Sequence, residues 1–154
     1  MIAIIDYKAG NITSVRLGCE AVGATAQITS DPDIIRAASH IIFPGVGAAG
    51  YAMEKLQESN LIPIIKECIA SDKPFLGICL GTQILFEHSE EDGGVKTLGV
   101  FPGNVKKFIP QSHLDKIPHM GWNQAKQKYA HPLLKGVPDG ADFYFVHSYY
   151  TEPA

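Results

Sequence analysis

Cys79 lies between two glycines in a pattern typical of a nucleophilic cysteine. Residues 77–81 read Gly-Ile-Cys-Leu-Gly, after an apolar segment and before one with helical spacing. A sharp strand-to-helix turn strains its central residue, and the flanking glycines remove β-carbons that would collide. The thiol then projects beside the helix N-terminus, where backbone N–H groups stabilise a thiolate. The pattern predicts a nucleophile; the alternative is a buried cysteine on a packed turn.

Two further segments could complete a site around this thiol. The Leu80 N–H follows the cysteine directly and is placed to support an oxyanion. Residues 44–47 read Pro-Gly-Val-Gly, and the glycines around Val46 let the backbone approach a ligand and present N–H groups to it. An ordinary strand-ending turn is the alternative. Gln83 follows Cys79 by four residues, so its amide could bind a polar substrate from the same side of the helix.

The other two cysteines have a different environment. Cys19 and Cys68 each lie on the apolar face of a predicted helix, so we expect them to pack in the core. The three cysteines show neither a Cys-x-x-Cys motif nor metal-type pairing, which favours a reduced, cytosolic setting. We expect neither a metal nor a cofactor.

Alternating strands and helices must position these groups. We expect strands at residues 2–6, 24–28, 40–43 and 75–78. Helices are expected after Asn11, after residues 30–32, and over 51–57, 61–70 and 80–86. This order predicts an α/β fold with a flavodoxin-like, mostly parallel sheet and helices on both faces. Ligands of such sheets bind at the carboxyl ends of the strands, where residues 6–11, 44–47 and 79–83 lie.

The pattern changes after residue 94. Residues 100–109, 119–125 and 143–150 look like strands separated by turn-rich stretches, and we expect them to add antiparallel strands at one edge. A chain of 154 residues with 45% hydrophobic side chains suits one domain, residues 1–154.

Charge and hydropathy narrow the class of partner. Charged residues make up 19% of the chain and the net charge is −3, which gives no reason to expect nucleic acid or an anionic membrane surface as partner. No apolar run approaches the roughly 20 residues that cross a bilayer. Residues 1–6 read as a strand and not as a signal peptide, so we expect a cytoplasmic protein.

The motifs together resemble a known family. Residues 77–83 are similar to the nucleophile segment of class I glutamine amidotransferases. Residues 6–11, 44–47, 118–123 and 145–149 sharpen the likeness to the glutaminase subunits of imidazole glycerol phosphate synthase. The resemblance runs in order from residue 2 to about residue 150.

The resemblance implies a reaction shared between two proteins of a heterodimer. The glutaminase subunit hydrolyses glutamine to glutamate and ammonia, and the ammonia passes through a tunnel to a (β/α)₈-barrel cyclase subunit. That subunit makes imidazole glycerol phosphate and aminoimidazole carboxamide ribotide in histidine biosynthesis. A tunnel makes chemical sense because ammonia released into neutral water is mostly protonated and no longer nucleophilic.

Site residues carry over by position. The resemblance implies Cys79 as nucleophile; Val46, Gly47 and Leu80 in the oxyanion region; Gln83, Glu91, Ser148 and Tyr149 in glutamine binding; and Asn11, Pro118, His119, Met120 and Trp122 at or near the synthase interface. From the residues alone, Trp122 could instead belong to the core, and Glu91 could belong to a solvated charge run.

The chain departs from the family in one respect. Family members complete a triad with a histidine and a glutamate in a Phe-His-Pro-Glu type segment, which these 154 residues lack. A cysteine hydrolase needs a base beside the thiol, so we expect the sequence to be C-terminally incomplete and inactive or impaired as it stands. His147 is an alternative base.

Other functions remain open at this level. One alternative is a non-catalytic docking module for the synthase. Another is the glutaminase of the anthranilate or GMP pathway, against which residues 6–11 and 118–123 argue. A third is a cysteine hydrolase or thiol-redox protein on a similar sheet, although no Cys-x-x-Cys motif supports redox chemistry.

Overall fold

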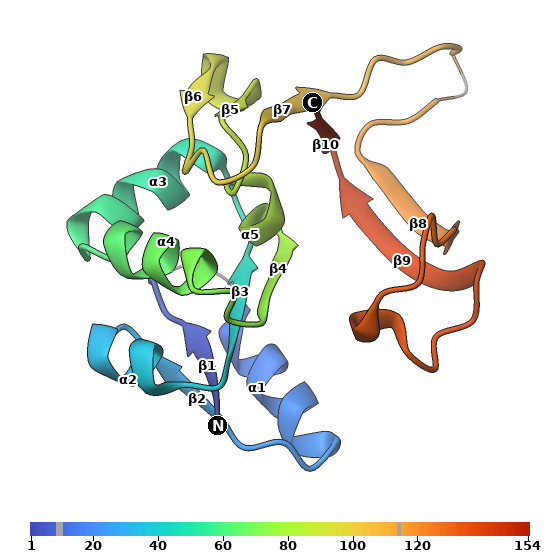
Figure 1. The fold of residues 1–154 in the computed structure, drawn as a ribbon. Coiled ribbons are helices and arrows are strands. Elements are labelled where there is room, and N and C mark those ends of the chain that lie inside the picture. The colour runs from blue at the N-terminus through green and yellow to red at the C-terminus, as the bar shows by residue number, and fades with distance from the viewer. Residues whose placement is uncertain (9–10, 114) are drawn as a thin grey trace. The chain divides into compact units, whose positions relative to one another are not determined.

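A computed structural model of the chain describes residues 1–8, 11–113 and 115–154. Contacts divide it into two compact units. Unit 1 comprises Met1–Lys106 with Thr151–Ala154, and unit 2 comprises Lys107–Tyr150 (Figure 1). Each unit is described by itself below, and the single domain expected over residues 1–154 stays a prediction.

Unit 1 alternates strands and helices along the chain. In order, its elements are β1 (Ile2–Ile5), α1 (Ile12–Ala21), β2 (Ala26–Thr29), α2 (Pro32–Ala37), β3 (His40–Gly45), α3 (Ala49–Glu58), α4 (Ile62–Ala70), β4 (Phe75–Cys79), α5 (Leu80–Gln83), β5 (His88–Ser89), the 3₁₀ helix η1 (Glu91–Gly93), β6 (Val95–Lys96) and β7 (Gly103–Lys107). The predicted strands and helices up to β4 are all present, with ends that differ by a few residues.

The first four strands form one parallel sheet in the order β2-β1-β3-β4. In Figure 1, α1 lies on one side of this sheet, and α2, α3 and α4 lie on the other. Crossovers between parallel strands need such helices, and the helices bury both faces of the sheet. The predicted α/β fold with a helix-covered parallel sheet is confirmed.

The register of the sheet aligns the carboxyl ends of three strands. Ile4 of β1 pairs with Ile42 of β3, and Gly45 at the end of β3 pairs with Cys79 at the end of β4. Adjacent strands lie roughly 5 Å apart. The segment that follows β3 therefore begins beside the cysteine turn, whereas β1 ends one strand further away.

A continuous core holds these elements. Its buried residues are Ala3, Ile5, Tyr7, Ile35, Ala38, Ile41, Phe43, Ala49, Ala52, Leu56, Leu61, Ile64, Ile65, Cys68, Leu80, Ile84, Leu85 and Leu98. Cys19 and Cys68 are both buried, as their places on apolar helix faces predicted. Tyr7, Phe43 and Phe75 form an edge-to-face series of rings through the centre, with centroids 5.5 and 6.1 Å apart.

Helix ends follow the capping chemistry expected from the sequence. The Asn11 side chain accepts a hydrogen bond from the Ser14 N–H at the start of α1, and Asp31 accepts one from the Asp33 N–H at the start of α2. The helix predicted over residues 80–86 is shorter in the structure. Beyond α5, the backbone continues in turns, with the Leu85 N–H bonded to the Thr82 carbonyl.

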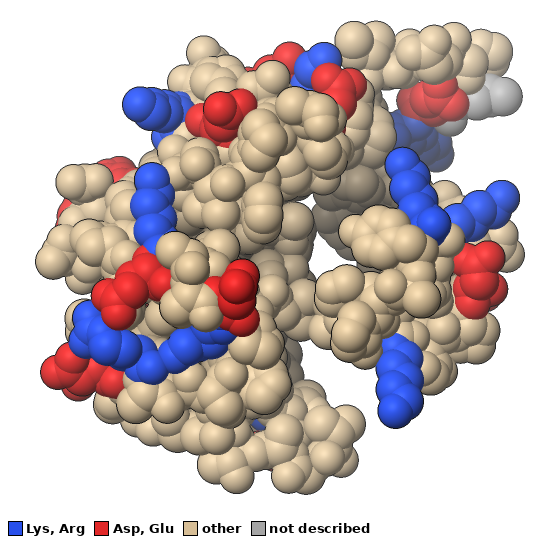
Figure 2. Space-filling model, viewed as in Figure 1, with Lys and Arg blue, Asp and Glu red and all other residues tan. Residues whose placement is uncertain are grey.

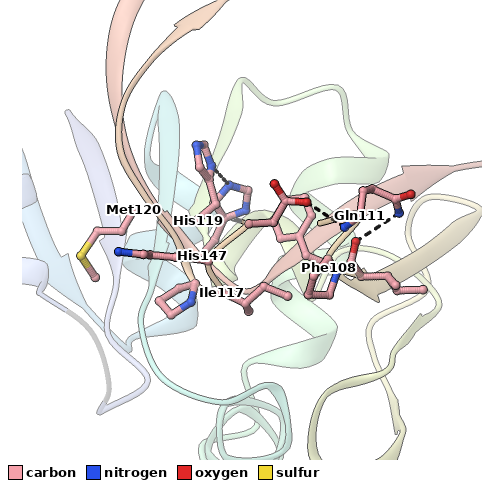
Figure 3. Close-up of a pocket in the computed structure, with 11 residues that line it drawn as sticks. Phe108, Gln111, Ile117, His119, Met120 and His147 are labelled. Atoms are coloured by element: carbon pink, nitrogen blue, oxygen red, sulfur yellow. Dashed lines mark hydrogen bonds between the residues drawn. The ribbon is translucent and has the colours of Figure 1, made fainter. Parts of the chain in front are cut away.

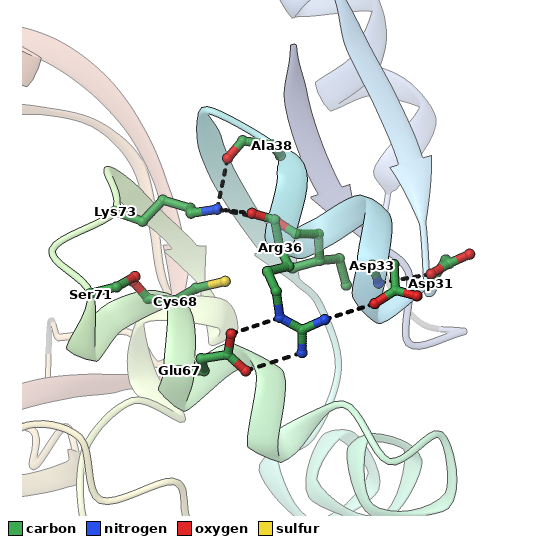
Figure 4. A network of polar contacts seen from close by, with 9 residues as sticks. Asp31, Asp33, Arg36, Ala38, Glu67, Cys68, Ser71 and Lys73 are labelled. Carbon is green, nitrogen blue, oxygen red and sulfur yellow. Dashed lines mark hydrogen bonds and ion pairs between the residues drawn. The ribbon is translucent and has the colours of Figure 1, made fainter.

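Polar side chains tie α2 to α4 on the surface (Figure 4). Arg36 donates to both carboxylate oxygens of Glu67, at 2.7 and 3.1 Å, and also pairs with Asp33. The Lys73 ammonium donates to the carbonyls of Arg36 and Ala38, at 2.5 and 2.8 Å, and so caps the end of α2. Figure 2 shows the corresponding basic and acidic side chains side by side over these helices.

The later strands form sheets of their own. They comprise β8 (His119–Ala125), β9 (Ala141–His147) and β10 (Tyr149–Pro153), with the 3₁₀ helix η2 (Pro132–Leu134) between β8 and β9. β8 and β9 pair antiparallel with each other, while β10 joins β7, β5 and β6 in a second four-stranded sheet. The expected antiparallel pairing is present, but not as an extension of the parallel sheet. The strand predicted over residues 143–150 is interrupted at Ser148.

Among the described residues, no helix combines the length and apolar character that a membrane span requires.

Candidate functional site

Cys79 occupies a strained turn at the carboxyl end of β4. Its backbone has φ +55° and ψ −119°, a conformation that non-glycine residues rarely adopt. α5 begins at the next residue, Leu80. The Cys79 side chain is exposed, in contrast to the buried Cys19 and Cys68. The turn therefore has the elbow geometry that the sequence pattern predicted.

The two glycines around Cys79 are required by close backbone contacts. A β-carbon on Gly77 would lie 2.8 Å from the Gly81 carbonyl oxygen and from the Thr82 α-carbon. One on Gly81 would overlap the carbonyl oxygen of Phe43 in β3. The Thr82 hydroxyl also donates to the Gly77 carbonyl at 2.6 Å. These contacts lock the elbow against β3 and leave the thiol facing solvent.

The Val46–Gly47 turn begins directly after the residue that pairs with Cys79. Gly45 is buried in this pairing, whereas Val46 and Gly47 are exposed. Gly47 has φ +95°, which favours glycine, and open space surrounds the position of its missing β-carbon. Exposed backbone beside an exposed thiol can offer N–H groups to a ligand.

Tyr7 is a neighbour of the elbow for which the sequence gave no role. It follows β1, is fully buried, and interacts electrostatically with Cys79. Burial, together with the nearby Cys79 charge, raises the pKa of Tyr7 to about 12. In the sequence, Tyr7 could have been noticed as a candidate because it is an aromatic residue directly after a predicted strand.

Glu91 has a structural contact that the sequence did not reveal. Its carboxylate accepts a hydrogen bond from the Ala49 N–H at 2.8 Å, and the Asp92 carboxylate accepts one from the Gly50 N–H at 3.1 Å. Because the N-cap residue Ala48 offers no side-chain acceptor, η1 supplies the caps of α3. Burial raises the pKa of Glu91, the Ala49 N–H opposes this, and the Asp92 charge adds to it.

The remaining residues matched to glutamine binding are divided between the units. Gln83 ends α5 in unit 1 and is half-buried. Ser148 and Tyr149 belong to unit 2, where the Ser148 carbonyl accepts from the Phe108 N–H at 3.0 Å. The structure brings Val46, Gly47 and Leu80 together around Cys79, but it does not define the place of Ser148 and Tyr149 relative to the thiol.

Unit 2 contains a hollow of about 1050 Å³ lined by a pair of histidines (Figure 3). His147 Nδ1 lies 2.8 Å from the Tyr149 carbonyl, which can only accept, so Nδ1 carries the proton. Nε2 of a neutral His147 is then an acceptor, and His119 Nδ1 donates to it at 3.1 Å. Rings of Phe108 and Phe145 pack against the two imidazoles. This network gives His147 a structural role within unit 2.

The opposite face of the β8–β9 pair is apolar and exposed. Met120 pairs with Val146, and Trp122 pairs with Tyr144, so the four side chains share one face. Their exposed fractions are 60%, 49%, 72% and 55%. Trp122 contacts Tyr144 edge to face at 5.6 Å, and its exposure rules out the core position considered from the sequence.

The remaining residues assigned to the partner interface are also outside the core. Asn11 is exposed at the start of α1 in unit 1, Pro118 is exposed, and His119 is half-buried. Asn11 has a capping role there in addition to any contact with a partner.

Comparison with known proteins identifies relatives over the whole chain. The family model "Glutamine amidotransferase class-I" matches residues 3–154. The imidazole glycerol phosphate synthase subunit HisH of Dehalococcoides mccartyi is 49% identical over 154 residues, which cover 100% of this chain and 74% of the relative. The subunit of the same name from Nitrosococcus oceani is 51% identical, covering 99% of this chain and 73% of the relative.

Solved structures share the fold at low sequence identity. A crystal structure of a glutamine amidotransferase superposes with a TM-score of 0.72 at 12% identity, covering 99% of this chain and 74% of that one. A glutamine amidotransferase from Thermotoga maritima gives a TM-score of 0.63 at 17% identity, covering 99% of this chain and 62% of that one. At these identities the likeness concerns the fold alone.

Proposed function

The chain belongs to the class I glutamine amidotransferase family, and from this premise we propose that it is the glutaminase subunit of an imidazole glycerol phosphate synthase in histidine biosynthesis. It hydrolyses glutamine to glutamate and ammonia, and the ammonia serves the partner synthase subunit. The observation that carries the proposal is the exposed Cys79 thiol on a strained strand-to-helix turn, in a chain about half identical to HisH subunits.

Cys79 acts as the nucleophile. Its sulfur attacks the side-chain amide carbon of glutamine, and the thiol proton passes through a base to the leaving nitrogen, which departs as ammonia. The resulting thioester is hydrolysed by water, which forms glutamate and restores the thiol. The strained turn supports this role because it holds the thiol outside the packed core at the carboxyl edge of the sheet.

Backbone N–H groups stabilise the tetrahedral intermediate. The Leu80 N–H is the first of α5 and therefore has no partner within the helix. The Val46–Gly47 turn begins beside Cys79 because Gly45 and Cys79 are register partners. Together these groups form the oxyanion site, which adds most of its stabilisation in the transition state, where the charge develops.

Glutamine is held by side chains around this edge. Gln83 contributes from α5, and Glu91 contributes while its carboxylate also anchors the start of α3. Ser148 and Tyr149, which belong to unit 2, match glutamine-binding positions of the family. The roles of these four residues in glutamine binding rest on their match to glutamine-binding positions of the family.

His147 is not assigned as the general base of the reaction. Cys79 is a free, exposed cysteine. His147 donates to the Tyr149 carbonyl and accepts from His119, which occupies both of its ring nitrogens. In longer family members, the resemblance implies that the base is the histidine of a Phe-His-Pro-Glu type segment, with its glutamate as orienting partner.

The partner is a (β/α)₈-barrel cyclase subunit, with which the chain forms a cytoplasmic heterodimer. The exposed apolar face of Met120, Trp122, Tyr144 and Val146 supports a protein interface, since aromatic side chains and methionine are enriched at such surfaces. Asn11, Pro118 and His119 are also assigned to contact with the partner by positional match. The proposed reaction needs neither a metal nor a cofactor.

The decisive measurement is glutamate release by the full-length protein mixed with its barrel partner. We expect Cys79→Ser to abolish release, whereas the matched control Cys68→Ser, in the core of α4, leaves it within a few-fold. Binding of the partner without glutamate release by the full-length wild type would instead identify a docking module.

A second measurement tests the nucleophile directly. A glutamine-analogue electrophile should label Cys79 and spare the buried Cys19 and Cys68, as mapped by peptide mass spectrometry. Label on either buried cysteine, with Cys79 unmodified, would refute the assignment.

A further inference from the structure

The Tyr7 hydroxyl is fully buried and has no hydrogen-bond partner among the described residues. An unpaired buried hydroxyl costs about 1–3 kcal/mol, and such groups are rare in folded proteins. Phenylalanine would fill the same space beside Phe43 without that cost. The hydroxyl is therefore destabilising where it lies, which is typical of a group retained for function.

The Tyr7 hydroxyl oxygen lies close to Gly45 at the end of β3, where β3 meets the first residues of α5. A β-carbon built on Gly45 would meet the Tyr7 hydroxyl oxygen at 2.9 Å, the Leu80 β-carbon at 2.9 Å and the Gly81 backbone nitrogen at 2.6 Å. Gly45 is itself the register partner of Cys79. Tyr7 thus reaches from the end of β1 across β3 to the first residues of α5.

Tyr7 remains protonated at neutral pH. Burial, together with a negative charge on Cys79, raises the pKa of Tyr7 to about 12. Because no acceptor competes for its proton, the O–H group can turn toward a charge that develops nearby. In a buried, low-dielectric setting, such a dipole has a stronger effect than it would in water.

We propose that Tyr7 is a positioning residue of the elbow, whose neutral hydroxyl stabilises negative charge at Cys79 from the buried side. This inference rests on the proposed glutaminase function for its catalytic consequence. It does not require contact with glutamine, because Tyr7 has no exposed surface.

The test compares Tyr7→Phe with Tyr129→Phe, a matched removal of one hydroxyl from an exposed tyrosine in unit 2. Three quantities are measured in the full-length protein: the rate of Cys79 alkylation by iodoacetamide at neutral pH, kcat and KM for glutamate release with the barrel partner, and the urea midpoint of unfolding.

For Tyr7→Phe we expect alkylation of Cys79 and kcat to fall by about 3- to 10-fold, less than the loss of a direct oxyanion donor. KM should stay unchanged, and the urea midpoint should stay the same or rise, because the unpaired hydroxyl is gone. Tyr129→Phe should change none of these.

Two results would overturn the proposal. Unchanged alkylation and kcat in Tyr7→Phe would reduce Tyr7 to a packing residue, and a lower urea midpoint would show that its hydroxyl has a structural partner. Absence of glutamate release from the wild type would refute the proposed function instead, and the alkylation rates would still decide the role of Tyr7.

Discussion

Unit 1 and unit 2 differ in how their side chains are held. In unit 1, a continuous core runs from β1 to Leu98, and the rings of Tyr7 and Phe43 are fully buried within it. In unit 2, none of the described residues is fully buried. Its strands are held by the β8–β9 ladder, by ring contacts around Phe108, and by loop contacts such as the Gln127 N–H to the Asp139 carboxylate at 2.7 Å.

The difference separates two ways of presenting functional groups. Unit 1 fixes an exposed thiol through backbone contacts so close that Gly77 and Gly81 admit no β-carbon. Unit 2 presents large apolar side chains such as Trp122 to solvent, which is typical of a surface that another molecule covers. Substitutions should therefore change stability in unit 1 and binding in unit 2.

The largest expected effect tests the tight packing of unit 1. Gly81→Ala places a methyl group on the Phe43 carbonyl oxygen, so β3 and the elbow must separate. We expect a loss of about 3 kcal/mol or more in the free energy of unfolding, measured in urea. Gly18→Ala in α1 is the control: nothing lies within 4 Å of its new methyl, and helix propensity favours alanine by up to about 1 kcal/mol. Equal stability of the two variants would contradict the elbow packing.

A second prediction concerns the exposed face of unit 2. Trp122→Ala should weaken binding of the barrel partner by about 2 kcal/mol, as expected for a central aromatic at an interface, in a titration calorimetry experiment. The free energy of unfolding should change by no more than about 0.5 kcal/mol, since Trp122 is 72% exposed. Tyr129→Ala, equally exposed but outside the assigned interface, should bind normally. Destabilisation without weaker binding would place Trp122 in a structural role.

A smaller loss of stability is expected when a polar contact at the surface of unit 1 is removed. Lys73→Met removes the donor to the Arg36 and Ala38 carbonyls and should cost about 1–2 kcal/mol of stability in urea unfolding (Figure 4). Lys66→Met on the exposed side of α4 makes the same change of charge and should stay within about 0.5 kcal/mol of the wild type. A similar loss in both variants would point to net charge instead of the cap.

The last effect is confined to alkaline pH. The pKa of Tyr7 is raised to about 12 in the folded state, against about 10 in an unfolded chain. Between these values the unfolded chain releases a proton that the folded one keeps, so stability falls as pH rises. Tyr7→Phe lacks this group and should lose less stability than the wild type between about pH 9 and 11.5 in urea unfolding. Parallel curves for the two proteins would show that the phenol ionises alike in both states.

Local patterns in the sequence were sufficient for most of unit 1. The alternation of apolar strands with amphipathic segments located β1 to β4, and Asn11 and Asp31 marked two helix starts that the structure confirms. The Gly-x-Cys-x-Gly spacing predicted the strained turn at Cys79, because only glycine fits at its flanks. These features depend on neighbours close in sequence.

Features that join distant segments were not predictable in this way. Glu91 and Asp92 cap α3 across 42 residues, and Lys73 caps α2 across 37 residues. The short α5 also differs from the helix expected over residues 80–86, since its apolar residues continue into buried turns instead.

The sequence by itself determined the α/β order, the position of the strained cysteine turn and the likeness to class I glutamine amidotransferases, because these follow from residue types at short spacing. The tertiary structure decided the register that sets Gly45 beside Cys79, the burial of the unpaired Tyr7 hydroxyl and the exposure of Trp122. Those properties depend on which strands pair and which faces are covered, and the free energy of that choice comes from contacts between residues far apart in the chain.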